Sequence, residues 1–259
     1  MVSKKMNIKH LSRFFVMLFL GALLLAGPTT RSQAQDAIKI AVATNFIRTA
    51  DELAGSFAKE SDIVVIRSSG ATGLLYSQIV NGAPYDLFLS ADETRPELLY
   101  RQGLCEEPFT YAGGRVVLWS ARTDLDESEN WQKVIMRSDI SRVAIANPET
   151  APYGRAAFAA IERAGIGGLM KPRLVYGQNV GQAFQYGGQG AADMAFVSLS
   201  FALSEQGRRG KTWRLPEAEP VVQKGCLLAG SKNKESVHEL LAFFRTGQAK
   251  TILSESGYN

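Results

Sequence analysis

The sequence is poor in histidine and cysteine, the residues most often used for metal and nucleophile chemistry. Only two of each occur among 259 residues, and His10 lies within the first 34. A catalytic triad that relies on histidine, or a zinc site of histidines and cysteines, therefore has almost no material beyond that segment. The remaining histidine, His238, lies in an amphipathic helical pattern and is expected at the surface.

A net basic charge is also missing once the first 34 residues are set aside. The formal charge is +4, but five of the 29 basic residues and none of the 25 acidic ones lie in residues 1–34. The rest of the chain thus has 24 basic against 25 acidic residues, which removes the usual electrostatic footprint of a nucleic-acid-binding protein. The composition is 46% hydrophobic with 24 Gly and 9 Pro, which is typical of globular proteins and excludes disordered, collagenous and coiled-coil classes.

No apolar run is long enough for an ordinary membrane span. The longest covers residues 14–26, follows a basic start, and precedes small and polar residues. This pattern predicts a secretory signal peptide over residues 1–34, cleaved near Ala34. A membrane anchor is the alternative, but it needs roughly 20 apolar residues, and no cysteine lies near the cleavage site to carry a lipid. We therefore expect an exported protein.

Export bears on the two cysteines, Cys105 and Cys226. An oxidising compartment permits a disulfide between them. Two separate buried thiols are the alternative, and the sequence leaves both open because it does not show their distance.

Strand-like and helix-like segments alternate along the chain. Strands are expected at residues 38–43, 63–67, 87–89, 116–119, 143–146, 174–176, 194–197 and 221–228. Helical patterns cover residues 50–57, 74–80, 97–101, 156–164, 181–186 and 237–253. This alternation predicts an α/β protein with parallel sheets covered by helices. Because the pattern restarts near residue 143, we expect two lobes.

Small, uncharged polar residues follow four of these strands where a helix begins. They lie at residues 44–45, 68–73, 151–154 and 178–180. Ligands of open α/β sheets bind beyond the carboxyl ends of the strands, and helix N-termini offer unpaired N–H groups to anions. Each position alone is explained by helix capping. Their joint occurrence predicts a small-anion site made of neutral donors.

Longer motifs surround these positions. In order they are AVATNF (41–46), SSGATG (68–73), YSQI (76–79), NGAPYDLFLSAD (81–92), YAGGRVVLWS (111–120), ANPE (146–149), APYG (151–154) and NV (179–180). In this order and spacing the chain resembles the periplasmic molybdate-binding proteins of molybdate ABC importers, which are type II solute-binding proteins. The resemblance covers nearly the whole chain beyond the leader.

The resemblance implies a two-lobed periplasmic-binding-protein fold with a ligand cleft between the lobes. Lobe one would comprise residues 37–118 and 221–259, and lobe two residues 119–220. It further implies a monomeric binding protein, not an enzyme, that needs no cofactor. The ligand would be molybdate, with tungstate accepted as well, and the partners would be the membrane permease subunits of an ABC importer.

The resemblance also implies a set of ligand-binding residues. Carried over by position, these are Thr44, Asn45, Ala71, Thr72, Tyr153 and Val180, with Ser69, Asn179 and Ser198 as further candidates. Ala71, Tyr153 and Val180 would act through backbone N–H groups. One branch of the family has a tyrosine at the position of Ser198 and a single serine at that of Thr44 and Asn45, so the chain resembles the other branch.

Neutral donors suit molybdate because it is fully deprotonated at neutral pH, so all its oxygens accept hydrogen bonds. A protonated phosphate would need an acceptor, and the acidic residues Asp51 and Asp92 lie outside the donor segments. Three alternatives stay open: a receptor for another oxyanion such as sulfate, an exported hydrolase with Ser69 or Thr72 as nucleophile, and a scaffold for a partner protein. The hydrolase needs a general base, and the sequence offers no evident one.

Overall fold

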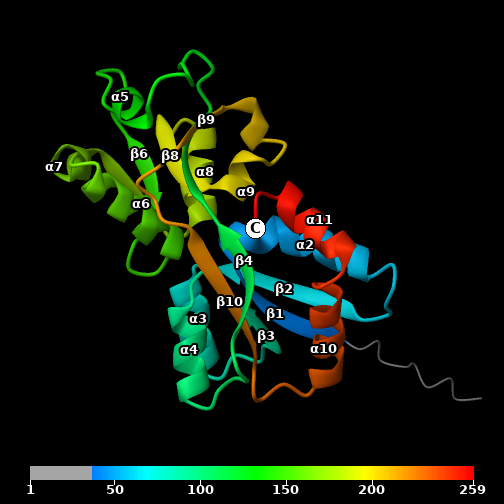
Figure 1. The fold of residues 1–259 in the computed structure, drawn as a ribbon. Helices are drawn as coiled ribbons and strands as arrows, with labels where there is room; N and C mark the ends of the chain where they lie inside the picture. Colours follow the sequence, from blue (N-terminus) through cyan, green and yellow to red (C-terminus); the bar gives the residue numbers. More distant parts are fainter. Residues whose placement is uncertain (1–36) are drawn as a thin grey trace, which may run out of the picture. The chain divides into compact units, whose positions relative to one another are not determined.

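The computed structural model describes residues 37–259, and two five-stranded sheets organise them (Figure 1). The strands are β1 (Ala37–Ala43), β2 (Val64–Gly70), β3 (Leu87–Leu89), β4 (Phe109–Gly114), β5 (Val116–Ser120), β6 (Val143–Ala146), β7 (Leu174–Gly177), β8 (Met194–Ser198), β9 (Lys211–Arg214) and β10 (Val221–Leu227). The first sheet has the order β2-β1-β3-β10-β4, and the second has the order β7-β6-β8-β5-β9. The signal peptide predicted at residues 1–34 lies outside the described residues.

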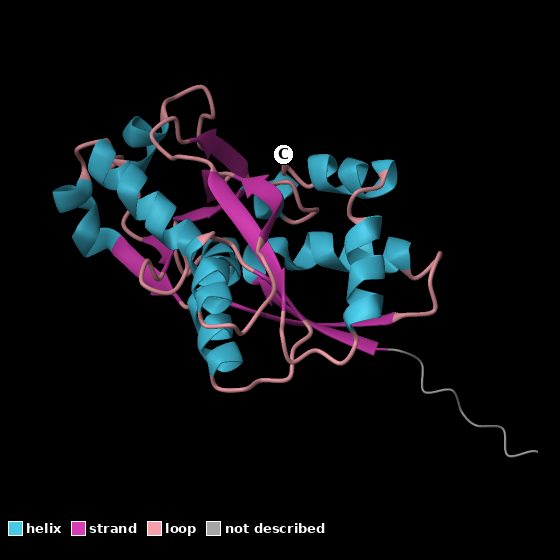
Figure 2. Ribbon diagram, turned by 60° about the horizontal axis from the view of Figure 1, so that its bottom comes forward, coloured by secondary structure: helices cyan, strands magenta, loops and turns pink. Residues whose placement is uncertain are grey.

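Helices flank both sheets, as Figure 2 shows. The α-helices are α2 (Ile47–Phe57), α3 (Thr72–Val80), α4 (Thr94–Arg101), α5 (Trp131–Ile135), α6 (Pro152–Arg163), α7 (Gly167–Met170), α8 (Val180–Gly188), α9 (Leu199–Ala202), α10 (Lys234–Phe243) and α11 (Gly247–Glu255). The short 3-10 helices are η1 (Thr44–Phe46), η2 (Lys171–Arg173) and η3 (Gly207–Arg209). None of the helices described between residues 37 and 259 is long and apolar enough to cross a membrane.

The two sheets are mixed, whereas the alternation of strands and helices predicted parallel ones. Within the first sheet β1 runs parallel to β2 and β3, but β10 is antiparallel to β3 and β4. Within the second sheet β6 runs parallel to β7 and β8, but β5 is antiparallel to β8 and β9. The reason is that β5 and β10 enter their sheets from the other lobe. Two strands, β4 and β9, were not predicted.

The chain passes between the sheets twice. It leaves the first sheet at Arg115, between β4 and β5, and returns where β10 begins at Val221. The sequence analysis expected the first crossing after Leu118, but all of β5 pairs within the second sheet. We call the part around the first sheet lobe one (residues 37–114 and 221–259) and the part around the second lobe two (115–220).

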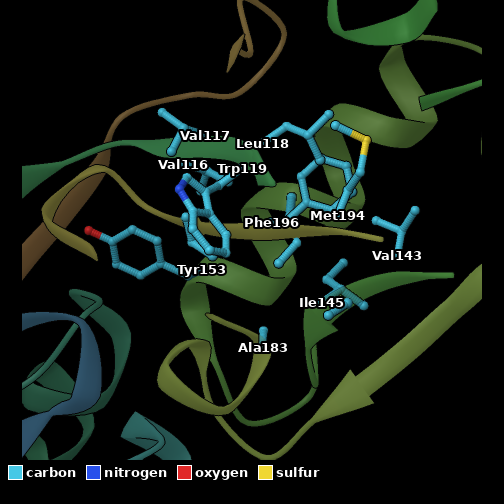
Figure 3. Close-up of a cluster of buried hydrophobic side chains, with 14 of the residues drawn as sticks. Val116, Val117, Leu118, Trp119, Val143, Ile145, Tyr153, Ala183, Met194 and Phe196 are labelled. Carbon is cyan, nitrogen blue, oxygen red and sulfur yellow. The ribbon is translucent and has the colours of Figure 1, made fainter. Parts of the chain in front are cut away.

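Each lobe has a hydrophobic core around its sheet, and the core of lobe two extends to three alanines at the strand ends of lobe one. In lobe two, Val117, Trp119 and Phe196 pack with the helices that cover the sheet, and Figure 3 shows Tyr153 at the edge of this cluster with its hydroxyl pointing away from it. In lobe one, the main cluster joins the strands to α2 and α10. Because each core is closely packed, each lobe holds its side of the cleft rigidly.

The segment predicted as one helix over residues 237–253 forms two. Helix α10 ends at Phe243, and α11 begins at Gly247. Thr246 caps α11, since its side chain accepts the N–H of Ala249 at 3.2 Å. The sequence pattern does not reveal this break, because apolar residues recur at helical spacing on both sides of it.

The two cysteines are free thiols, both buried. They belong to one apolar cluster in lobe one. A hydrogen bond with Cys105, together with burial, raises the pKa of the Cys226 thiol. The structure therefore brings the pair together without a disulfide.

Helix α6 lies directly against β6, and this contact requires glycine at position 154. A Cβ at Gly154 would lie 2.0 Å from the carbonyl oxygen of Ala146. We expect Gly154→Ala to lower the free energy of unfolding by about 1–3 kcal/mol, because the helix must shift away from the strand. Gly55→Ala is the control: nothing lies within 4 Å of a Cβ there, so it should stabilise α2 by up to about 1 kcal/mol. Urea denaturation measures both, and equal stabilities would contradict the packing described.

Candidate functional site

A small cavity lies between the lobes, where parallel strands of both sheets end. Its lining residues are Ala43, Thr44, Asn45, Gly70, Ala71, Thr72, Ala91, Ala151, Pro152, Tyr153, Asn179 and Val180. They lie at or just after the carboxyl ends of β1, β2, β3, β6 and β7. Its volume of about 10 Å³ is that of one water-sized sphere.

Four helices begin at this cavity. Thr44 opens η1, Thr72 opens α3, Pro152 opens α6 and Val180 opens α8. The first N–H groups of an α-helix have no intrahelical acceptor, and the helix dipole places positive charge at this end. Two termini come from each lobe, so the site combines N–H donors and favourable dipoles from both. Such an arrangement suits an anion.

The structure brings together the six residues that the resemblance singled out. Thr44, Asn45, Ala71, Thr72, Tyr153 and Val180 all line the cavity, and so does Asn179. The side chain of Asn179 accepts the N–H of Gln182 at 3.0 Å and caps α8.

The other two candidates lie outside the lining. Ser69 is exposed on β2, which forms the edge of its sheet. Ser198 is fully buried, caps α9, and shares a 2.8 Å hydrogen bond with the hydroxyl of Ser200. Neither hydroxyl reaches the cavity.

The two threonine hydroxyls of the cavity differ in their partners. Thr72 Oγ1 accepts the N–H of Ala91 at 3.1 Å, which leaves its own hydrogen free to donate. Thr44 Oγ1 is buried with no hydrogen-bond partner among the described residues, as is Thr49 Oγ1. Buried polar atoms in native proteins are almost always paired. Because Thr44 lines the cavity and Thr49 does not, of these two unpaired hydroxyls only that of Thr44 is available to a ligand there that accepts its hydrogen.

Asn45 uses its side chain for a buried polar network rather than for the cavity. Its Nδ2 donates to Gln223 Oε1 at 2.8 Å and to the Tyr258 hydroxyl at 3.1 Å. Gln223 Nε2 in turn donates to the Tyr153 hydroxyl at 3.2 Å. Tyr153 belongs to lobe two and the other three residues to lobe one, so the network ties α6 to the opposite lobe.

The network is neutral. Burial raises the pKa of Tyr153 well above its usual value and that of Tyr258 to about 12. Both phenols therefore keep their protons at physiological pH. No Lys, Arg, His, Asp or Glu lines the cavity, and His238 is exposed on α10. Thr72 thus has no general base beside it, and the cavity offers hydrogen-bond donors without a formal charge.

The lobes touch across the cavity. A Cβ at Gly181, at the start of α8, would lie 2.7 Å from Cγ2 of Thr44. Glycine at this position lets the N-terminus of α8 come close to the donor loop of lobe one.

Comparison with known proteins places the chain in a family. Residues 38–259 match the family described as bacterial extracellular solute-binding protein. The chain belongs to this family. Among curated relatives, the molybdate-binding protein ModA of Azotobacter vinelandii is 35% identical over 96% of this chain and 97% of its own. The corresponding protein of Rhodobacter capsulatus is 33% identical over 84% of this chain and 86% of its own.

Solved structures agree with the sequence relatives. The periplasmic molybdate-binding protein of Azotobacter vinelandii has a TM-score of 0.81 and 37% identity, covering 86% of this chain and 98% of its own. The sulfate-binding protein SubI of Mycobacterium tuberculosis has a TM-score of 0.73 at 15% identity, covering 86% of each chain, and shows the fold alone. The expectations of a periplasmic-binding-protein fold and of a binding protein rather than an enzyme are confirmed.

The sequence did not predict the residues that hold the cavity-lining residues in place. Gln223 comes from the returning strand β10, and Tyr258 is the penultimate residue, which lies beside Asn45 only in the folded protein. No local pattern marks either residue. Ala91 lies in the segment NGAPYDLFLSAD (81–92), but an alanine gives no sign that its N–H orients a threonine hydroxyl.

The unequal partners of the two threonines predict opposite effects on the ligand-free protein. Thr44→Val removes an unpaired buried hydroxyl, so the free energy of unfolding should stay the same or rise by up to about 1 kcal/mol. Thr72→Val leaves the N–H of Ala91 without its acceptor, so the free energy of unfolding should fall by about 1–3 kcal/mol. Chemical denaturation measures both. A larger loss for Thr44→Val than for Thr72→Val would contradict this description of the site.

Proposed function

We propose that the protein captures molybdate in the cavity between the lobes. It does so as an exported, monomeric binding protein without a cofactor, and it delivers the ion to the permease subunits of an ABC importer. The observation that carries the proposal is the convergence of four helix N-termini on one small, uncharged cavity. The relatives named as molybdate-binding proteins support the choice of ligand.

The donors belong to both lobes. The hydroxyls of Thr44 and Thr72 and the backbone N–H groups of Ala71, Tyr153 and Val180 would contact the oxyanion. Because the side chain of Asn45 is engaged with Gln223 and Tyr258, Asn45 would contribute its backbone N–H. A hydrogen bond to a charged group is worth about 1.5–3 kcal/mol, so a handful supports tight binding after the costs of desolvation and lobe closure.

The protonation state of the ligand is the basis of selectivity. Molybdate and tungstate have four acceptor oxygens and no proton at neutral pH, which matches a lining of donors. A protonated phosphate needs an acceptor that the lining lacks. Sulfate offers the same acceptors on a smaller ion, so the size of the closed cavity would separate it from molybdate.

Titration calorimetry tests the proposal directly. We expect tight binding of molybdate and tungstate, much weaker binding of sulfate, and none of phosphate. Binding that is strongest for sulfate, or no binding of molybdate, would overturn the proposal.

A matched pair of variants tests the site. Thr44→Val should weaken molybdate binding about 10- to 100-fold, which corresponds to one charge-assisted hydrogen bond. Ser69→Ala removes an exposed hydroxyl outside the lining and should bind as the wild type does. Equal affinities of the two variants would remove Thr44 from the proposed site.

The affinity should not depend on pH between about pH 6 and pH 9, because no group lining the cavity titrates there. Tyr258 has a folded-state pKa raised from 10.0 to about 12. The contribution of Tyr258 to the free energy of unfolding is therefore complete below pH 10 and is lost as the pH rises through about 12. Titration calorimetry between about pH 6 and pH 9, in buffers of equal ionic strength, measures how the affinity for molybdate depends on pH. A midpoint near neutral pH would show that a titratable side chain takes part.

A further inference from the structure

The rim of the cleft carries contacts between the lobes that are separate from the cavity. The N–H of Gly73 donates to the carbonyl of Thr150 at 2.9 Å, and Arg95 Nη2 donates to the carbonyl of Glu149 at 3.2 Å. Arg155 of α6 approaches Asp92 with 3.8 Å between Nη2 and Oδ2. Each contact joins lobe one to the segment of lobe two around the start of α6.

Asp92 is the fixed half of this ion pair. It is 9% exposed, forms a salt bridge with Arg95, and accepts the backbone N–H of Arg95 at 3.1 Å and the hydroxyl of Ser90 at 3.0 Å. All these partners belong to lobe one. The carboxylate is thus held in place by its own lobe, and Arg155 is its partner from the other lobe.

Both halves of the pair are directly linked to the cavity. Ala91 precedes Asp92 in the chain, lines the cavity, and orients the hydroxyl of Thr72 through its N–H. Arg155 follows Tyr153 by two residues on the first turn of α6. Separation of Arg155 from Asp92 therefore also separates the donors of the two lobes.

We propose that Arg155 and Asp92 form a clasp that keeps the lobes closed over the bound oxyanion and so slows its release. This inference rests on the proposed function, since the oxyanion is the guest retained. Arg155 does not line the cavity and is a positioning residue. Its guanidinium is half-exposed, so its loss should speed release by about two- to fivefold, as for a partly exposed ion pair.

Arg163 provides the matched control. It lies on the same helix, is similarly exposed, and pairs with Glu219 of its own lobe at 2.6 Å. Removal of either arginine lowers the local positive charge by one, but only Arg155 bridges the lobes. Electrostatic attraction of the anion would instead act on the association rate and would weaken with salt.

The experiment measures the release of radioactive molybdate from the full-length protein after dilution into excess unlabelled molybdate. We expect faster release from Arg155→Gln, release close to wild type from Arg155→Lys, and no change in Arg163→Gln. The association rates and the melting temperatures of the ligand-free variants should match those of the wild type.

Unchanged release from Arg155→Gln, an equal acceleration in Arg163→Gln, or an effect confined to the association rate would overturn the clasp. Failure of the wild type to bind molybdate would instead contradict the proposed function, so the two failures are distinguishable.

Discussion

A buried anion with two negative charges needs compensation, and this site has no cation in its lining to supply it. The alternative is to collect many N–H and O–H donors at one point. A single helix terminus provides only a few such donors, so several must converge. The fold meets this requirement by placing the ends of parallel strands from two sheets on either side of one cavity. The two-lobed architecture is therefore tied to the chemistry of the site, because each lobe supplies only two of the four helix N-termini.

The side chains that lie behind the donors are also uncharged. Asn45, Gln223, Tyr153 and Tyr258 pair with one another beneath the donors, and burial keeps both phenols protonated. Charged groups lie farther out, where Asp92 and its arginines meet at the rim of the cleft. Neutral donors at the centre and ion pairs at the rim let the lobes close without burying an unpaired charge in the cavity.

Much of this arrangement could be predicted from the sequence because it depends on local signals. Apolar runs located the main strands, and the small polar residues after four of them located the donor loops. The features that were missed depend on distant parts of the chain. Strands β5 and β10 were predicted, but their antiparallel direction was not, because it follows from the crossings between lobes. The direction of the Asn45 side chain is likewise set by distant residues, Gln223 and Tyr258. Ser69 and Thr72 lie in the same short motif, yet only Thr72 lines the cavity. The motif alone does not show which hydroxyl faces inward.

A crystal structure of the molybdate complex, with anomalous scattering used to locate molybdenum, tests the central claim most directly. The account predicts one strong peak inside the cavity, with the oxyanion's oxygens within hydrogen-bond distance of Thr44 Oγ1, Thr72 Oγ1 and the backbone nitrogens of Tyr153 and Val180. A peak elsewhere, or an oxyanion held by a lysine or arginine side chain, would contradict it.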